Sequence, residues 1–265
     1  MPDLSVEEIV NSLSSDTGTI GRKIFFFDSL ASTNTLAMEL ASNGCEEGTV
    51  IISDEQTGGR GRLGRSWISP PRKNLYLSMV LRPHIPPRDA TILTLMSAVA
   101  CTHAVKNISG IPVSIKWPND IMVSNKKLGG ILTEVKAGMD SIKHAIIGVG
   151  LNINTGSSEL SEAIKTSATS VMIETGTSHS RTLFAVEILK ETNKWHKTLL
   201  GKGKKPILEE WLRLSSTIGR TVQVREGKNK VTGIAEGIDN EGMLILKLGN
   251  GSHKRICAGD LSILP

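Results

Sequence analysis

The spacing of apolar residues predicts an alternation of helices and strands through most of the chain. Ile92, Leu95 and Val99 recur at helical spacing, which is typical of an amphipathic helix over about residues 89–107. Ser5 and Glu8 have capping-box spacing and begin a helix over 6–13. Further helices are expected from residue 33 and over 159–174, 180–200 and 206–214. A strand that we interpret as buried is expected over 24–27, and two further strands over 49–52 and 74–81. Four more strands are expected to form an antiparallel meander, over 113–117, 121–123, 130–135 and 144–153.

The pattern changes after residue 214. Short strands are expected over 221–225, 230–238, 243–248 and 254–258, separated by turns rich in Gly, Asn and Asp. Regularly spaced turns of this kind indicate a small β-barrel of about fifty residues. The sequence therefore predicts two domains, residues 1–214 and residues 215–265.

Composition narrows the class of protein. The chain has 265 residues, of which 39% are hydrophobic and 22% charged, as in an ordinary globular protein. It has no apolar run of about 20 residues and no signal-peptide pattern at its start, so a cytoplasmic protein without membrane binding is expected. Three scattered cysteines and six scattered histidines argue against disulfides and a protein-held transition metal. The net charge of +5 favours anionic ligands.

The most informative segment lies between residues 54 and 67. Arg60, Arg62 and Arg65 alternate with glycines there, directly after a predicted strand. Glycine lets the backbone approach a ligand closely, and arginine brings forked donors for phosphate or carboxylate. A disordered Arg/Gly linker touching nucleic acid is the alternative, but the segment occurs once, lies between strands and ends in Trp67. We interpret it as an active-site loop that binds an anion.

Two later segments add chemistry. Residues 116–120 (KWPND) place Asp120 close to Lys116 and Lys127, an arrangement that suits recruitment of Mg²⁺ to a nucleotide, although such a turn is more often a plain hairpin. The strand at 146–154 carries Gly148 and Gly150 on one face, which clears space for a flat ligand or serves close packing. P-loop and Rossmann motifs are absent from the sequence, so the site is of another kind. Arg, Lys, Asp and Asn dominate the motifs and handle phosphate electrostatically without supplying a covalent nucleophile, which indicates phosphoryl or nucleotidyl chemistry.

In this order, the motifs resemble those of the biotin protein ligases (biotin–[acetyl-CoA-carboxylase] ligases). They are STN at 32–34, Gln56 with GRGRLGR at 59–65, KWPND at 116–120, KLGGIL at 127–132 and GVGLNIN at 148–154. The resemblance implies an α+β fold: a catalytic domain like class II aminoacyl-tRNA synthetases, with a mixed sheet and flanking helices, followed by an SH3-like β-barrel. Leu63 stands where some members have another arginine, a minor departure.

The resemblance also implies roles for individual residues. Biotin would be bound by Ser32, Thr33, Asn34, Gln56, Gly59, Arg60, Gly61, Arg62, Lys127, Gly130 and Gly148. ATP and the adenylate would be bound by Arg62, Arg65, Trp67, Asn119, Lys127 and Asn152. The catalytic set would be Arg60, Arg62, Lys116, Asp120 and Lys127, with Asp120 also serving Mg²⁺.

The implied reaction uses ATP and Mg²⁺ to convert biotin into biotinyl-5′-AMP, which then biotinylates a lysine of a biotin carboxyl carrier protein. A homodimer through residues 145–153 is expected from the family and from an exposed apolar strand edge. Bifunctional members carry an N-terminal winged helix-turn-helix of about sixty residues, and only about twenty precede the first core strand here, so specific DNA binding is not expected.

Two other functions are alternatives to biotin ligation. A lipoate or octanoyl ligase shares the fold and the carrier-lysine chemistry, but the complete arginine loop together with KWPND argues against it. A basic nucleic-acid-binding protein would need stacking aromatic residues near its basic groups, and aromatic residues are 3% of this chain.

Overall fold

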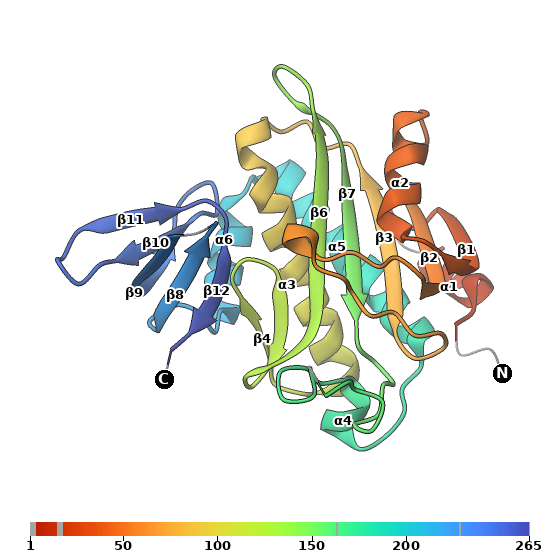
Figure 1. Ribbon diagram of the computed structural model, residues 1–265. Helices are drawn as coiled ribbons and strands as arrows, with labels where there is room; N and C mark the ends of the chain where they lie inside the picture. The colour runs from red at the N-terminus through yellow and green to blue at the C-terminus, as the bar shows by residue number, and fades with distance from the viewer. Residues whose placement is uncertain (1–3, 15–17, 163, 228, 265) are drawn as a thin grey trace.

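The computed structural model describes residues 4–14, 18–162, 164–227 and 229–264 (Figure 1). The first sheet and its helices comprise α1 (Val6–Leu13), β1 (Lys23–Leu30), α2 (Thr33–Ser42), β2 (Thr49–Gln56), η1 (Arg62–Gly64), β3 (Leu75–Leu81), η2 (Pro87–Asp89), α3 (Ala90–Ser109), β4 (Val113–Lys116), β5 (Asp120–Val123), β6 (Lys126–Ala137), β7 (Ile142–Leu151), α4 (Val171–Thr175), α5 (Arg181–Lys202) and α6 (Lys205–Leu214). The second sheet comprises β8 (Thr221–Glu226), β9 (Asn229–Ile238), β10 (Leu244–Lys247), β11 (His253–Ile256) and β12 (Asp260–Ile263).

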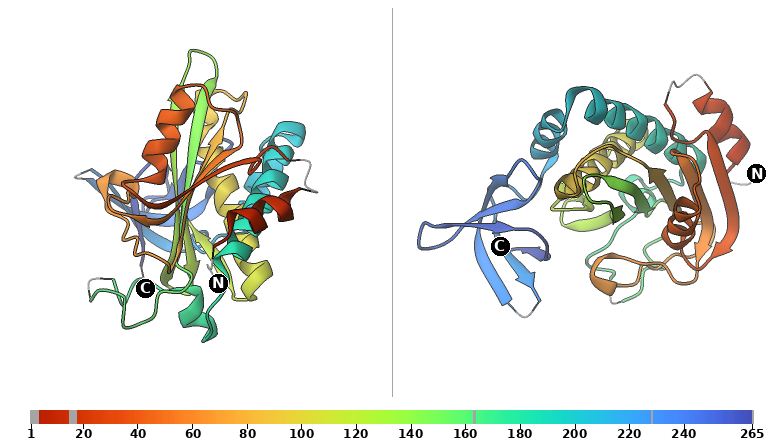
Figure 2. Two further views of the ribbon diagram at one scale, coloured as in Figure 1. Left: turned by 90° about the vertical axis from the view of Figure 1, so that its right-hand side faces the viewer. Right: turned by 90° about the horizontal axis from the view of Figure 1, so that it is seen from above.

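The first sheet has the strand order β1-β2-β3-β7-β6-β5-β4. β1 and β2 are parallel and every other neighbouring pair is antiparallel, so the sheet is mixed and the meander from β4 to β7 is as predicted. The long helices α3 and α5 cover one face, where Val50, Met79 and Ile147 belong to the main core (Figure 2). This arrangement confirms the α+β class.

The opposite face of the sheet is only partly covered by a helix. α2 packs there on Ile51, Val80 and Ile146, which form a separate small core. Cross-strand pairs share a face, so the pairing of Gly148 with both Ser78 and Leu132 places these residues on the α2 face. Of these three residues, Gly148 and Ser78 have little or no side chain, and Leu132 is apolar.

The second sheet is antiparallel, with the order β11-β10-β9-β8-β12. It joins the first sheet at Trp117, which is buried: its backbone N–H donates to Thr217 Oγ1 at 2.9 Å and its indole N–H to the Gly242 carbonyl at 3.2 Å. The four predicted strands are confirmed, whereas β12 was not predicted. Closure into a barrel and the boundary between residues 214 and 215 remain predictions.

Three expectations about single elements were wrong. β1 is an edge strand with mostly part-exposed residues, and Phe26 is 38% exposed, so it is not a buried strand. Within 159–174, only the part in α4 is helical and turns fill most of the rest, with residue 163 outside the described residues. β7 is paired with β3 on one side and β6 on the other, so residues 145–151 present no free strand edge.

α1 begins at the predicted capping residue, because the Ser5 hydroxyl accepts from the Glu8 backbone N–H at 3.3 Å. α3, α5 and α6 lie within a few residues of their predicted bounds. In the part of the chain that the structure describes, we find no helix with the length and apolar character needed to cross a membrane.

Candidate active site

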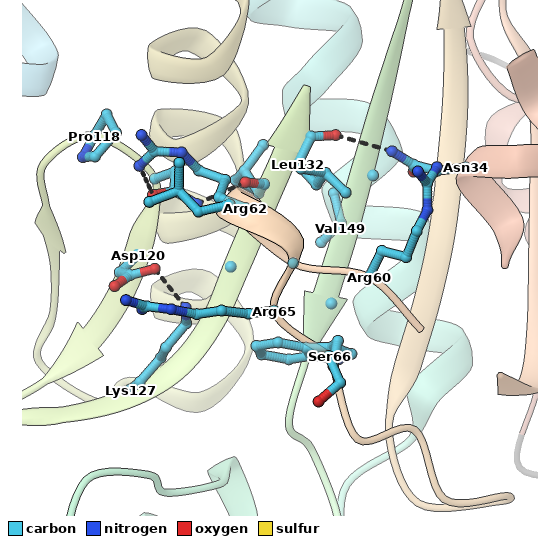
Figure 3. Close-up of a pocket in the computed structure, with 18 of the residues that line it drawn as sticks. Asn34, Arg60, Arg62, Arg65, Ser66, Pro118, Asp120, Lys127, Leu132 and Val149 are labelled. Atoms are coloured by element: carbon cyan, nitrogen blue, oxygen red, sulfur yellow. Dashed lines mark hydrogen bonds and ion pairs between the residues drawn. The ribbon is translucent and has the colours of Figure 1, made fainter. Parts of the chain in front are cut away.

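A pocket opens on the glycine-rich part of the α2 face (Figure 3). Five segments far apart in sequence form it: the start of α2, the loop from β2 to β3, the β4–β5 turn, the strands β6 and β7, and the start of β12. Its lining residues are Ser32, Thr33, Asn34, Gln56, Arg60, Gly61, Arg62, Leu63, Arg65, Ser66, Trp67, Leu77, Lys116, Trp117, Pro118, Asn119, Asp120, Lys127, Gly130, Ile131, Leu132, Gly148, Val149, Gly150, Gly259, Asp260 and Leu261.

The start of α2 forms the polar end of the pocket. Gln56 Oε1 accepts from the Thr33 backbone N–H at 2.9 Å and lies 3.2 Å from Thr33 Oγ1. The buried Ser78 hydroxyl lies 2.7 Å from Thr33 Oγ1 and 2.6 Å from Asn34 Oδ1. A linked network thus holds donors and acceptors in fixed positions before any ligand arrives.

The loop from β2 to β3 is folded onto itself. The Gly61 N–H donates to the Arg65 carbonyl at 2.7 Å, and the Trp67 N–H donates to the Gly59 carbonyl at 2.9 Å. Leu63 takes a left-handed conformation with φ 56° inside the short η1 turn. A Cβ atom at Gly59 would lie 2.3 Å from the Trp67 carbonyl oxygen, so only glycine fits there. This compact loop contradicts the alternative of a disordered linker.

Each arginine of the loop contacts a different segment. Arg60 Nη2 lies 2.9 Å from Glu134 Oε2, Arg62 Nη1 donates to Asn119 Oδ1 at 2.8 Å, and Arg65 Nη2 lies 2.5 Å from Asp260 Oδ2. Burial lowers the pKa of the Arg62 guanidinium, although Asp120 and Asp260 oppose that shift. The three guanidinium groups are therefore spread across the pocket, with Arg60 at the α2 end and Arg62 and Arg65 toward Asn119 and Asp260.

Asp120 lies between two lysines, near Arg62 and Arg65. Its carboxylate is 2.6 Å from Lys127 Nζ and 3.5 Å from Lys116 Nζ. Lys127 Nζ also lies 5.4 Å from the centre of the Trp67 ring, within cation–π distance. Together with the arginines, these lysines make the pocket suited to a polyanion such as a nucleotide.

The floor of the pocket consists of glycines on β6 and β7. A Cβ atom at Gly148 would lie 2.1 Å from Asn34 Oδ1, and one at Gly150 would lie 2.6 Å from Trp67 Cε2. At Gly130 it would lie 3.2 Å from Lys127 Cε. The absence of side chains at these positions is therefore what lets Asn34 and Trp67 approach the sheet.

This chain resembles proteins of one family over nearly its whole length. The Biotin/lipoate A/B protein ligase family matches residues 26–152, and the Biotin protein ligase C terminal domain matches residues 217–264. The bifunctional ligase/repressor BirA of Bacillus subtilis is 36% identical over 247 residues, which are 93% of this chain and 76% of that protein. The chain belongs to the biotin protein ligase family.

Other biotin protein ligases agree with this assignment. The biotin–[acetyl-CoA-carboxylase] ligase of Paracoccus denitrificans is 33% identical, with 82% of this chain and 90% of that protein covered. A solved structure, the biotin protein ligase from Aquifex aeolicus in complex with biotin and ATP, superposes with a TM-score of 0.78 at 29% identity and covers 92% of this chain and 99% of that chain. The resemblance seen in the sequence is therefore confirmed.

The structure brings together nearly all residues that the ligase resemblance singled out. Of these, Gly59 and Asn152 are not among the residues that line the pocket. The Gly59 carbonyl accepts the Trp67 N–H within the loop, and the Asn152 amide donates to the Thr169 carbonyl at 3.0 Å. Asn119 lines the pocket, but its amide is already bonded to Arg62 and to the Ile131 carbonyl. Direct contacts of all the predicted site residues with a ligand remain predictions.

Some lining residues were not anticipated. Leu132 lies on the α2 face with Gly148 and provides apolar surface, and alternation along β6 was the available signal for it. Leu77 and Val149 also line the floor, but their side chains belong to the main core on the opposite face. Gly150 belongs to the same glycine pattern as Gly148 but was given no role in the site. Asp260 enters from the second sheet, and nothing in the sequence near it indicates a pocket residue.

The carboxylates of the pocket determine how a metal ion could bind there. Within the described ranges, no group of three or more His, Cys, Asp or Glu side chains is placed to hold a metal ion. Asp120 is engaged by two lysines and Asp260 by Arg65. Because Mg²⁺ is commonly bound by one or two carboxylates together with substrate phosphates, this donor set fits Mg²⁺ that arrives with ATP.

Proposed function

We propose that this protein is an ATP-dependent biotin protein ligase, which activates biotin as biotinyl-5′-AMP and transfers it to a lysine of a carrier protein. One observation carries the proposal most strongly. The arginine loop, Lys116 and Lys127 surround a single pocket whose glycine floor adjoins a fixed polar network at α2. Membership of the family and the likeness to a ligase solved with biotin and ATP support the same activity.

Biotin would lie over the Gly148 part of the floor. Its bicyclic ring is flat, and the ureido group needs both donors and acceptors, which Ser32, Thr33 and Gln56 can supply at the polar end. Leu132, on the same face as Gly148, would contact the apolar parts of biotin. The carboxylate of the valeryl chain would then point toward Arg62 and Lys127.

ATP would occupy the side of the pocket that carries Trp67, with adenine against the indole ring. In the first step, a biotin carboxylate oxygen attacks the α-phosphorus, a new P–O bond forms and the bond to pyrophosphate breaks. Negative charge accumulates on the phosphate oxygens, and Lys116, Lys127 and Arg62 can stabilise it electrostatically without supplying a nucleophile.

Mg²⁺ would enter as part of the Mg–ATP substrate. Asp120 is the carboxylate nearest the lysines, and it would give the ion one oxygen while the phosphates give others. When bound, Mg²⁺ neutralises charge on the leaving pyrophosphate. The protein side chains position the nucleotide so that attack is in line.

In the second step, the neutral amine of a carrier lysine attacks the biotinyl carbonyl carbon. An amide forms, AMP leaves with the electrons of the C–O bond, and the amine loses a proton. The folded loop would keep water from hydrolysing the mixed anhydride before the carrier binds. The acceptor that we propose is the biotin carboxyl carrier part of an acetyl-CoA carboxylase or a related carboxylase.

A homodimer is also part of the proposal, at a different edge from the one predicted. β5 pairs with β6 only as far as Gly130, so no described strand covers the outer edge of residues 132–137. Val135 in this stretch is 40% exposed. Such an edge can pair with a second copy. A sedimentation or scattering mass that stays monomeric at all concentrations would exclude the dimer.

The activity is tested by biotin-dependent exchange of labelled pyrophosphate into ATP in the presence of Mg²⁺. The wild type should exchange label with biotin and not with lipoate. Arg60→Ala should weaken exchange by about tenfold or more, since a charge-assisted contact at the biotin end of the loop is lost. No exchange by correctly folded wild type with biotin would overturn the proposed function.

A further inference from the structure

Glu134 lies just outside the pocket, and none of the sequence motifs includes it. It belongs to β6, two residues beyond Leu132, and it pairs with Ile146 on β7. Its side chain therefore lies on the same face as Gly148, at the end where α2 begins to cover the sheet. The Glu134 side chain is 29% exposed. An acidic group that is largely removed from water beside an apolar core needs hydrogen-bonding or charged partners.

The partners come from two different segments. Glu134 Oε2 accepts a hydrogen bond from Asn34 Nδ2 at 2.8 Å and lies 2.9 Å from Arg60 Nη2. Figure 3 shows the Arg60 side chain directed toward Asn34. A single carboxylate oxygen on β6 thus joins the arginine loop to the first turn of α2.

This contact fixes the orientation of the Asn34 amide. Asn34 Nδ2 also donates to the Leu132 carbonyl at 3.2 Å, and Asn34 Oδ1 lies 2.6 Å from the Ser78 hydroxyl. A flipped amide would place its oxygen against the Glu134 carboxylate, which is unfavourable. Since Asn34 Oδ1 lies directly over Gly148, the carboxylate determines which amide atom faces the floor of the pocket.

The contact also anchors one end of the loop. Arg62 and Arg65 are held by Asn119 and Asp260 at the side where the nucleotide would bind. Arg60 is held by Glu134 at the opposite, α2 end. Without the carboxylate, the loop would lose its anchor there while keeping the others.

We propose that Glu134 is a positioning residue: it anchors Arg60, and with it the arginine loop, over the biotin end of the pocket, and it sets the orientation of the Asn34 amide. The inference rests on the proposed function. It assigns to Glu134 a role in biotin binding and in retention of the adenylate, without direct contact with either.

The test compares wild type, Glu134→Gln and Glu134→Asp with the matched control Glu226→Gln. Glu226 pairs with Lys254 at 2.9 Å in the second sheet, and its side chain is 30% exposed, close to the value for Glu134. Two quantities are measured: KM values in biotin-dependent pyrophosphate exchange, and the rate of tryptic cleavage after Arg60, Arg62 and Arg65 in ligand-free protein, mapped by mass spectrometry.

For both Glu134 variants, we expect the KM for biotin to rise by about fivefold or more and cleavage in the loop to accelerate by a similar factor. Gln removes the negative charge, and Asp keeps the charge but shortens the reach of the carboxylate toward Arg60 and Asn34. The KM for ATP and cleavage elsewhere in the chain should stay within about twofold of wild type, as should both quantities in Glu226→Gln. Cleavage confined to the loop separates this effect from global unfolding.

A double-mutant cycle with Arg60→Gln identifies the partner. If Glu134 acts through Arg60, Glu134→Gln should change the KM for biotin less in the Arg60→Gln background than in wild type. If the Glu134→Gln and Arg60→Gln substitutions changed the KM for biotin independently, so that their effects multiply, the proposal would be overturned. An unchanged KM for biotin or an unchanged loop cleavage rate in Glu134→Gln would also overturn it. Wild-type exchange activity is measured in the same experiment, so failure of the proposed function would be recognised separately.

Discussion

Arg65 and Asp260 connect the two sheets across the pocket: Arg65 Nη2 lies 2.5 Å from Asp260 Oδ2, although the two residues are 195 positions apart. The hydrogen bond from Arg65 holds the pKa of the Asp260 carboxyl below its usual value, and the same bond raises the pKa of Arg65. Both groups are therefore charged at neutral pH. The second sheet thus takes part in positioning the arginine loop.

Asp260→Asn should raise the KM for ATP by about threefold to tenfold, because Arg65 would lose its charged partner and move more freely at the nucleotide side. The KM for biotin should change by less. Pyrophosphate exchange at varied ATP concentration measures this. Glu236→Gln is a suitable control, since Glu236 is equally exposed at 38% in the same sheet and pairs with Lys247 at 3.6 Å, away from the pocket. Equal effects of the two variants on the KM for ATP would contradict the prediction.

Alanine substitutions at the two floor glycines, Gly148 and Gly150, should each raise the KM of a different substrate. Gly148→Ala would push against Asn34 and raise the KM for biotin, whereas Gly150→Ala would push against Trp67 and raise the KM for ATP. A displacement of this kind is expected to change each KM by about tenfold. Gly249→Ala is the control because a Cβ atom there meets nothing within 4 Å. If both alanine variants affected the same substrate, the placement of biotin and nucleotide would be wrong.

Lys127→Met should slow formation of biotinyl-5′-AMP by about 100-fold or more, because the cation that faces the developing phosphate charge is removed while the length of the side chain is kept. A single-turnover measurement of adenylate formation isolates this step. Lys126→Met is the control, since Lys126 precedes Lys127 and is exposed outside the pocket. An adenylation rate near that of wild type in Lys127→Met would show that charge at this position is not required.

Most of the residues predicted for the site line one pocket, although their contacts with ligands remain predictions, whereas the edges of the fold were predicted less well. Motifs spread from residue 32 to residue 150 meet in one pocket because β6 and β7 are neighbours and the arginine loop folds over them. The types of residue in the motifs and their order along the chain were enough to indicate which segments form the pocket. The contribution of Asp260 could not be predicted, because it depends on how the second sheet lies against the first and not on any local pattern.

The wrong expectations also have physical reasons. The run Phe25, Phe26 and Phe27 is as apolar as a buried strand, but an edge position leaves its side chains partly exposed. The stretch 159–170 has helical spacing, yet most of its described residues form turns. These turns are held to β6, because the Lys127 N–H donates to the Ser167 carbonyl at 2.8 Å. Tertiary contacts decided both cases, as they commonly do for short segments.

Breaking the buried ion pair between β2 and the start of α5 should strongly destabilise the protein. Arg181 Nη1 lies 2.6 Å from Asp54 Oδ1, and the two side chains are only 4% and 12% exposed. Asp54→Ala should lower the free energy of unfolding by about 3–5 kcal/mol, since the buried guanidinium loses its counter-ion. Urea denaturation measures the loss. Glu159→Ala, which breaks a half-exposed pair with Lys73, should cost less than about 1 kcal/mol. Equal losses in the two variants would contradict the prediction.

Stability should also fall as the pH is lowered below neutrality, because of His196. This side chain is 4% exposed, its Nε2 has no hydrogen-bond partner, and burial lowers its pKa below the usual 6.5, although Glu47 at 3.9 Å partly opposes the shift. Between the lowered pKa and about 6.5, the unfolded chain binds a proton that the folded protein does not, so acid favours unfolding there.

His196→Gln should therefore reduce the drop in Tm between about pH 7.5 and about pH 5.5, measured by differential scanning fluorimetry. Part of the drop should persist, because burial and the nearby Arg82 also lower the pKa of His144. The exposed His84 supplies the control, since His84→Gln should leave the pH dependence of Tm as in wild type. If His196→Gln and His84→Gln gave the same pH dependence, protonation of His196 would not be the cause of the drop.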